Sequence, residues 1–236
     1  MESKNLKKVS IFVDGPNYFK SAGRRFHVDF GRFKEYIEER YGKIVKFRWY
    51  DLEPEILPID FDRTSYSKLE RIINSSADEE VQLSKLRKDP KALLQLINSY
   101  KTMVRTKGMY EAKKSFLSYV RNIGEVILGK CSVYENREEC PNCGIKFIST
   151  GKTEGGITDF NLGVDLIYYS ARDISDIFVL VSGDSHFLRA LRYVSEFGKK
   201  IVVFSFQDTT SFELKNNPII EYHSFESIKK EVEKES

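Results

Sequence analysis

Short apolar runs alternate with amphipathic segments along most of the chain. The apolar runs predict strands at Val9–Val13, Ile44–Tyr50, Glu125–Gly129, Ile177–Val181 and Ile201–Phe206. Between them, apolar residues recur at helical spacing and predict helices over residues 17–25, 32–41, 109–122, 159–171 and 187–197. Continuous apolar strands joined by helices indicate a mostly parallel sheet with helices on both faces. The predicted fold is therefore α/β, a Rossmann-like doubly wound domain that spans residues 1–236.

Three stretches depart from this alternation. Residues 55–107 begin after Pro54, include Pro58 and carry apolar stripes at helical spacing, so they predict a helical insertion. Residues 131–156 contain the run Cys-Pro-Asn-Cys-Gly and end in a Gly pair, which predicts an irregular loop. The mixed charges after Ser224 predict a solvated terminal helix.

Composition excludes several classes of protein. Hydrophobic residues make up 41% of the chain and charged residues 31%, and 17 Phe and 13 Tyr supply a core, so disorder is excluded as the main state. The apolar runs are too short for a membrane span, and the polar start of the chain is unlike a signal peptide. Three cysteines are too few for a disulfide framework. We therefore expect a cytoplasmic protein without a membrane partner.

Acidic residues follow two of the predicted strands. Asp14 ends the first strand in Asp-Gly-Pro-Asn, and Asp184 follows Ile177–Val181 in Ser-Gly-Asp-Ser-His. Parallel strands end at one edge of a sheet, so these carboxylates should converge there with Asp159, which begins a helix. Converging carboxylates suit Mg²⁺ or Mn²⁺, although each acid alone is equally typical of a helix cap or turn. Asn17 and Ser182 add oxygens that could hold a metal-bound water or a phosphate.

Asp165 is a weaker candidate in the same segment. It follows Asp159 by six positions, which is about 240° around a helix, so the two acids should not share a face.

The motifs that hold these acids resemble those of the NYN domains, which are PIN-like nucleases, and specifically the LabA-like branch. The motifs are Asp-Gly-Pro-Asn, the segment from Thr158 to Leu166, and the segment from Leu180 to Phe187. The resemblance covers residues 8–51 and 108–225 and leaves the insertion unmatched. It implies a PIN-like fold that hydrolyses RNA at a divalent metal, with Asp14, Asp159 and Asp184 as metal-binding acids. Further matches to the family motifs are Asn17 and Asp165.

Two positions depart from the family pattern. His186 stands where the family has a second acid, and the Lys-Gly pair that usually precedes the helix acid is absent before Asp159. His186 could bind a softer ion such as Mn²⁺, act as a general acid or base, or be a surface residue at a weakened site.

The cysteines predict half of a zinc site. Cys140 and Cys143 have the spacing of a zinc knuckle, but a structural zinc takes four ligands and the chain adds only Cys131. A histidine or a second subunit would have to complete the shell, and the alternative is a metal-free turn. The resemblance favours zinc, because some relatives carry a Cys-x-x-Cys loop here.

Positive charge is concentrated between Lys85 and Arg121. This segment contains ten Lys and Arg residues and only two acidic residues, whereas the net charge of the whole chain is only +3. Cations among aromatic residues suit single-stranded nucleic acid, although such residues also solubilise ordinary helices. The candidate RNA-binding residues are Lys101, Arg105, Lys107, Lys113 and Lys114.

These observations favour a metal-dependent endoribonuclease acting on single-stranded RNA. One alternative is a catalytically weakened RNA-binding module of the same fold. Another is a phosphatase or nucleotide hydrolase, although a Gly-rich phosphate loop of the NTPase kind is missing. Because PIN-like relatives often pair, a homodimer is also expected.

Overall fold

The computed structural model of the protein describes residues 6–23, 25–53, 108–130, 132–139, 146–153 and 157–234. The chain separates into two compact units, one with residues 1–53, 116–130 and 155–236, the other with residues 54–115 and 131–154. The predicted insertion at residues 55–107 lies entirely outside the described residues, and its limits stay a prediction.

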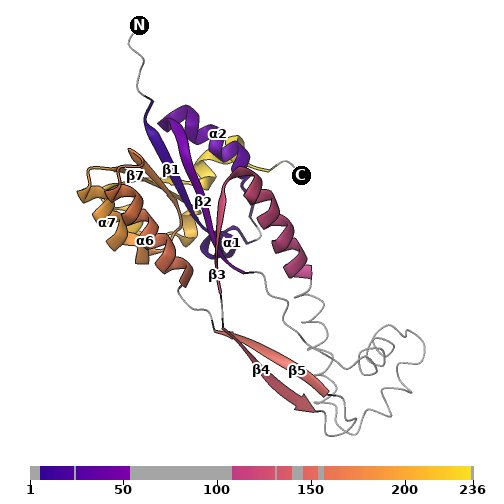
Figure 1. The fold of residues 1–236 in the computed structure, drawn as a ribbon. Coiled ribbons are helices and arrows are strands. Elements are labelled where there is room, and N and C mark those ends of the chain that lie inside the picture. The colour runs from indigo at the N-terminus through magenta and orange to yellow at the C-terminus, as the bar shows by residue number, and fades with distance from the viewer. Residues whose placement is uncertain are drawn as a thin grey trace. The chain divides into compact units, whose positions relative to one another are not determined.

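The first unit is built on a six-stranded sheet in which every neighbouring pair of strands is parallel. The strands lie in the order β3-β2-β1-β6-β7-β8 (Figure 1). Their bounds are β1 Lys8–Asp14, β2 Lys43–Leu52, β3 Glu125–Gly129, β6 Ile177–Val181, β7 Lys200–Ser205 and β8 Ile220–Ser224. The order runs outward from β1 in one direction and from β6 in the other, so the topology reverses between these two central strands. The predicted α/β class with a mostly parallel sheet is confirmed.

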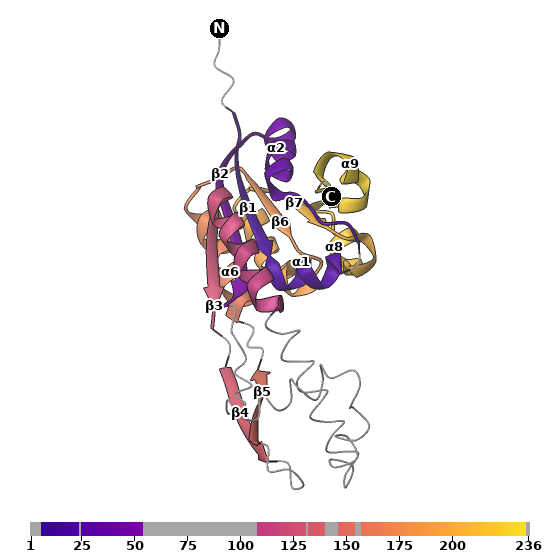
Figure 2. The ribbon, with the colours of Figure 1, turned by 90° about the vertical axis from the view of Figure 1, so that its right-hand side faces the viewer.

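Helices cover both faces of this sheet because side chains of successive strand residues point to opposite sides. On β1, Val9, Ile11 and Val13 enter the core formed with α1, α2, α9 and the helix over residues 108–123, whereas Phe12 enters the core formed with α6, α7 and α8. Figure 2 shows α2 and α9 together on one side of the sheet. The helices are α1 Gly15–Ala22, α2 Phe30–Tyr41, α6 Ile157–Ala171, α7 Leu188–Glu196, α8 Phe212–Lys215 and α9 Lys229–Val232, with 3₁₀ turns η1 Ser185–Phe187, η2 Gln207–Thr209 and η3 Phe225–Ile228.

The end of the chain differs from the prediction in two ways, although the predicted terminal helix is present as α9. The strand β8 was missed because its residues alternate in polarity at the edge of the sheet, unlike the continuous apolar runs of the central strands. The segment after it is not merely solvated: Phe225 and Val232 are fully buried, and the Asp29 backbone N–H donates to the Val232 carbonyl at 2.8 Å. The segment has many exposed lysines and glutamates, and they made its buried apolar face difficult to recognise in the sequence.

The irregular loop predicted at residues 131–156 was also wrong for most of its length. In the second unit, β4 Ser132–Glu139 and β5 Lys146–Thr153 pair as an antiparallel hairpin. These two strands were not predicted because they consist largely of charged and small residues, and neither strand contains an apolar run. Among the described residues, no helix has the length and apolar character that crossing a membrane requires.

Candidate metal centre

The candidate centre lies at the carboxyl ends of β1 and β6, where the topology of the sheet reverses. Val13 and Val181 are paired in the register of these strands, so the residues that follow them leave the sheet side by side. In open parallel sheets, this crevice is where ligands bind. The last residue of β1 is Asp14, whose side chain caps α1 by accepting a hydrogen bond from the Asn17 backbone N–H at 3.1 Å.

A network of hydrogen bonds fixes Asp14 and the turn after β6. The Ser182 hydroxyl donates to Oδ2 of Asp14 at 2.9 Å and accepts from the Asp184 backbone N–H at 3.2 Å. The Asn17 side-chain oxygen accepts from the Gly183 backbone N–H at 2.9 Å. Ser182 and Asn17 were predicted to hold water or phosphate. In the structure these contacts join the two strand ends.

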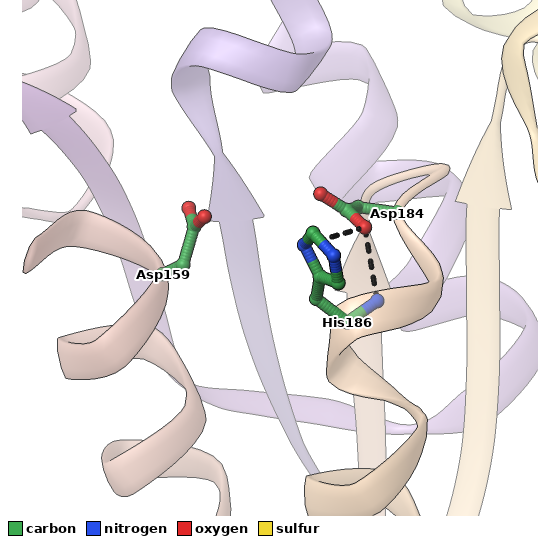
Figure 3. A group of neighbouring side chains, drawn as sticks. All are labelled: Asp159, Asp184 and His186. Carbon is green, nitrogen blue, oxygen red and sulfur yellow. Dashed lines mark hydrogen bonds and ion pairs between the residues drawn. The ribbon is translucent and has the colours of Figure 1, made fainter. Parts of the chain in front are cut away.

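Three further side chains meet at this edge (Figure 3). Asp159, Asp184 and His186 each offer one ligand atom, and these atoms all lie within 4.8 Å of one another. Asp159 reaches the group from the first turn of α6. Asp184 caps η1 by accepting from the His186 backbone N–H at 2.9 Å, and its carboxylate lies 3.2 Å from Nδ1 of His186. The His186 side chain is 81% exposed, so solvent or a substrate can reach it.

The carboxylates at this edge oppose one another's ionisation. Burial raises the pKa of Asp14 to about 6, against the lowering effect of the hydrogen bonds from Asn17 and Ser182, and the negative charges of Asp159 and Asp184 raise it further. Burial and the negative charge of Asp184 also raise the pKa of Asp159. The electrostatic effect of His186 acts in the opposite direction and lowers that pKa. A cation between these groups would relieve the repulsion. Carboxylate oxygens with one imidazole nitrogen fit Mn²⁺ well and Mg²⁺ less well.

Asp165 is placed elsewhere. Its Oδ2 accepts hydrogen bonds from Nη1 of Arg48 and from the Tyr50 hydroxyl, both at 2.6 Å. Arg48 also pairs with Glu125 at 2.7 Å and lies over the Tyr169 ring. The expectation that Asp165 and Asp159 occupy different faces of α6 agrees with this placement, and Asp165 serves to tie α6 to β2.

The structure does not test the remaining candidate residues as a site. Cys131, Cys140 and Cys143 lie outside the described residues, and so do Lys101, Arg105 and Lys107. Lys113 and Lys114 lie on the helix over residues 108–123, in the part that belongs to the second unit. Zinc binding and RNA binding by these residues stay predictions.

The tight packing of the turn after β6 could not be predicted from the sequence. A Cβ at Gly183 would lie 2.7 Å from the Thr209 carbonyl oxygen and 3.0 Å from Cα of Thr210, and the Gly183 carbonyl accepts from the Ser211 backbone N–H at 3.0 Å. The loop after β7 therefore supports the turn that carries Asp184. The sequence does have a Gly next to Asp184, but a Gly beside an acid is equally typical of a flexible turn.

Comparison with known proteins identifies the family. The NYN domain model matches residues 59–224, which is more than half of the chain. The chain belongs to the NYN domain family. NYN domains have a nuclease-type fold, and most of them are ribonucleases. The chain is therefore related to nucleases. The LabA-like branch stays a prediction.

The matched range differs from the expected one. It includes residues 59–107, which were expected to be unmatched, and it begins after β1 and Asp14. The NYN match thus contains Asp159, Asp184 and His186, while the parallel register with β6 is what places Asp14 beside them.

A solved structure has the same fold. The crystal structure of a protein of unknown function from Vibrio parahaemolyticus aligns with a TM-score of 0.52 over 95% of this chain and 96% of that chain, at 18% sequence identity. At this identity the likeness concerns the fold alone. No curated protein matches the sequence.

Proposed function

We propose that this protein is a metal-dependent ribonuclease that hydrolyses phosphodiester bonds in single-stranded RNA. The observation that carries the proposal is the group of Asp159, Asp184 and His186 at the reversal point of the sheet, with the buried Asp14 beside it. The NYN match adds support, because it makes a nuclease-type fold the setting of these acids.

In this proposal Asp159, Asp184 and His186 bind Mg²⁺ or Mn²⁺. A divalent ion so held activates water and neutralises charge on a phosphodiester. Asp14 adds negative charge to the site. The hydroxyl of Ser182 orients the Asp14 carboxylate through the 2.9 Å hydrogen bond. The Asn17 contact to Gly183 fixes the turn so that the Asp184 carboxylate is in position before any substrate arrives.

His186 differs from the acids because it supplies no negative charge when neutral. As a ligand its nitrogen favours Mn²⁺ over Mg²⁺. If it does not bind the ion, its exposed ring can exchange a proton with the attacking water or the leaving oxygen. These two roles make different predictions for its replacement by Asp, which are developed below.

The test is cleavage of a labelled single-stranded RNA in Mn²⁺, Mg²⁺ or EDTA by the wild type and by Asp184→Asn. Asn keeps the oxygen that caps η1 but loses the charge, so we expect a folded protein without cleavage. The matched control is Asp173→Asn, an exposed acid that pairs with Lys199 and whose positive φ of 55° suits Asn. It should cleave as the wild type does.

Cleavage by Asp184→Asn at the wild-type rate would contradict the proposal. If the wild type binds RNA in a salt-dependent way but never cleaves it, the RNA-binding module takes its place. Hydrolysis of small phosphate esters without RNA cleavage would instead indicate a phosphatase.

A further inference from the structure

Large hydrophobic side chains are exposed on α6, which carries Asp159 of the candidate centre, and on α7, which follows Asp184 and His186. Large hydrophobic residues are exposed on or at the end of these helices at Phe160 (69%), Val164 (46%), Tyr168 (54%), Tyr193 (39%) and Phe197 (48%). Scattered exposed hydrophobic residues such as Tyr193 and Phe197 are ordinary, but Phe160, Val164 and Tyr168 form a row on α6 that begins beside the candidate catalytic centre, and this row requires a reason.

Phe160 is the member of this row that adjoins the centre. It follows Asp159 directly in the first turn of α6, and it is the most exposed of the five. The opposite face of α6 is occupied, because Leu162 and Leu166 are buried in the core. Phe160 therefore projects from the outer face of α6, next to the acid that would hold the metal.

The row continues along α6 in a regular way. Phe160, Val164 and Tyr168 are spaced by four residues, so they lie on one side of the helix over about 12 Å. That length is near the span of two nucleotides in an extended strand.

Helix α7, which lies against α6 (Figure 1), carries exposed cations. A Cβ at Gly163 of α6 would lie 4.0 Å from Cβ of Ala190 of α7. Arg189 and Arg192 are exposed on α7, and Arg189 lies one turn beyond His186. Exposed aromatic rings flanked by arginines are the features with which proteins bind single-stranded nucleic acid through stacking and phosphate contacts.

We propose that Phe160 is a stacking platform for an unpaired base next to the scissile phosphate, a proposal that rests on the nuclease function proposed above. The ring holds the base, and Asp159, one residue earlier, serves the metal that acts on the adjoining phosphate. A base inside a duplex is stacked on its neighbours and does not offer a free face. The enzyme should therefore select single-stranded segments.

The size of the row favours a nucleobase over a second protein. At the exposures above, Phe160, Val164 and Tyr168 offer roughly 300 Å² of apolar surface in total, given about 150–250 Å² for each aromatic side chain. A stable protein interface needs about 800 Å² from each partner. A single ring is enough for one base.

The test separates binding from cleavage by working in EDTA. Phe160→Ala and wild type are titrated with a labelled single-stranded RNA, and stacking of one base predicts about a five-fold or greater loss of affinity for the variant. Phe197→Ala is the matched control, since it removes an exposed Phe at the other end of α7 and should bind within two-fold of wild type.

A second variant tests stacking directly. Phe160→Trp adds one exposed indole to a chain whose single native tryptophan, Trp49, is fully buried. We expect single-stranded RNA to quench the new fluorescence, and duplex RNA of the same sequence to leave it unchanged.

Equal affinity of Phe160→Ala and wild type would overturn the stacking role, and so would a change of oligomeric state in Phe160→Ala without loss of RNA affinity. Quenching by RNA together with no cleavage in Mn²⁺ would retain the stacking role and reject the ribonuclease function instead.

Discussion

The buried carboxylate of Asp14 should make the metal-free protein lose stability as the pH rises. Its pKa in the folded protein is about 6, against an ordinary value of 3.8. The folded state therefore holds more protons than the unfolded state between these two values, so the free energy of unfolding falls as pH increases through this window. A difference of that size corresponds to about 3 kcal/mol, and the 3% exposure of Asp14 leaves little solvent screening to reduce it.

The perturbation that isolates this effect is Asp14→Asn, which does not titrate in the same range. Urea unfolding in EDTA, followed by the fluorescence of the buried Trp49, gives the stability of both proteins at each pH. We expect the stability of the variant relative to wild type to rise by about 3 kcal/mol from pH 3.5 to pH 7. Any constant cost of the substitution, such as a poorer contact with Ser182, cancels from this comparison.

The same two proteins also report on the metal. Mn²⁺ at 100 times its dissociation constant should stabilise the wild type by about 2.7 kcal/mol at pH 7, and it should stabilise Asp14→Asn less. Stability curves that run parallel between pH 3.5 and pH 7 would refute the reasoning about Asp14. An equal response of both proteins to Mn²⁺ would refute its part in metal binding.

Three further substitutions test separate parts of the centre. Asp165→Asn weakens the contacts with Arg48, so unfolding should become easier by about 1–3 kcal/mol while Mn²⁺ affinity, measured by calorimetry, is unchanged; a large loss of affinity would return Asp165 to the ligand set. Gly183→Ala forces a Cβ against the Thr209 carbonyl, and we expect a loss of about 1–3 kcal/mol and weaker Mn²⁺ binding, checked by thermal unfolding and the same titration. His186→Asp should tighten Mg²⁺ binding more than Mn²⁺ binding if His186 is a ligand, and an unchanged ratio of the two affinities would favour its acid–base role.

The sequence was sufficient to predict the central strands and the edge of the sheet where the acids meet. Strands such as Ile177–Val181 are buried on both faces, so every residue in them is apolar. Such uninterrupted apolar segments predict the central strands of a parallel sheet. Parallel strands must end at a common edge, and this rule alone predicts that Asp14 and Asp184 lie close together.

Features that depend on contacts between distant segments could not be predicted in this way. The role of Asp165 is decided by Arg48 and Tyr50, which precede it by more than 100 residues. The edge strand β8 is half-buried, so its composition resembles a loop. Nothing in Ser182 or Asn17 indicated that their side chains hydrogen-bond the opposite strand end rather than face a ligand.

The position of β1 in the middle of the sheet also bears on how the chain folds. Val9 pairs with Ile44 on one side and with Ile177 on the other, so the second pairing closes a loop nearly five times longer. The extra loop-closure entropy is only about 1.4 kcal/mol, so the long intervening segment has little effect on equilibrium stability. Its kinetic consequence is larger. Until β6 docks, β1 presents an unpaired apolar edge, and this edge is where a slowly folding chain would associate with others of its kind. Slower synthesis at lower temperature should therefore increase the soluble yield of the protein.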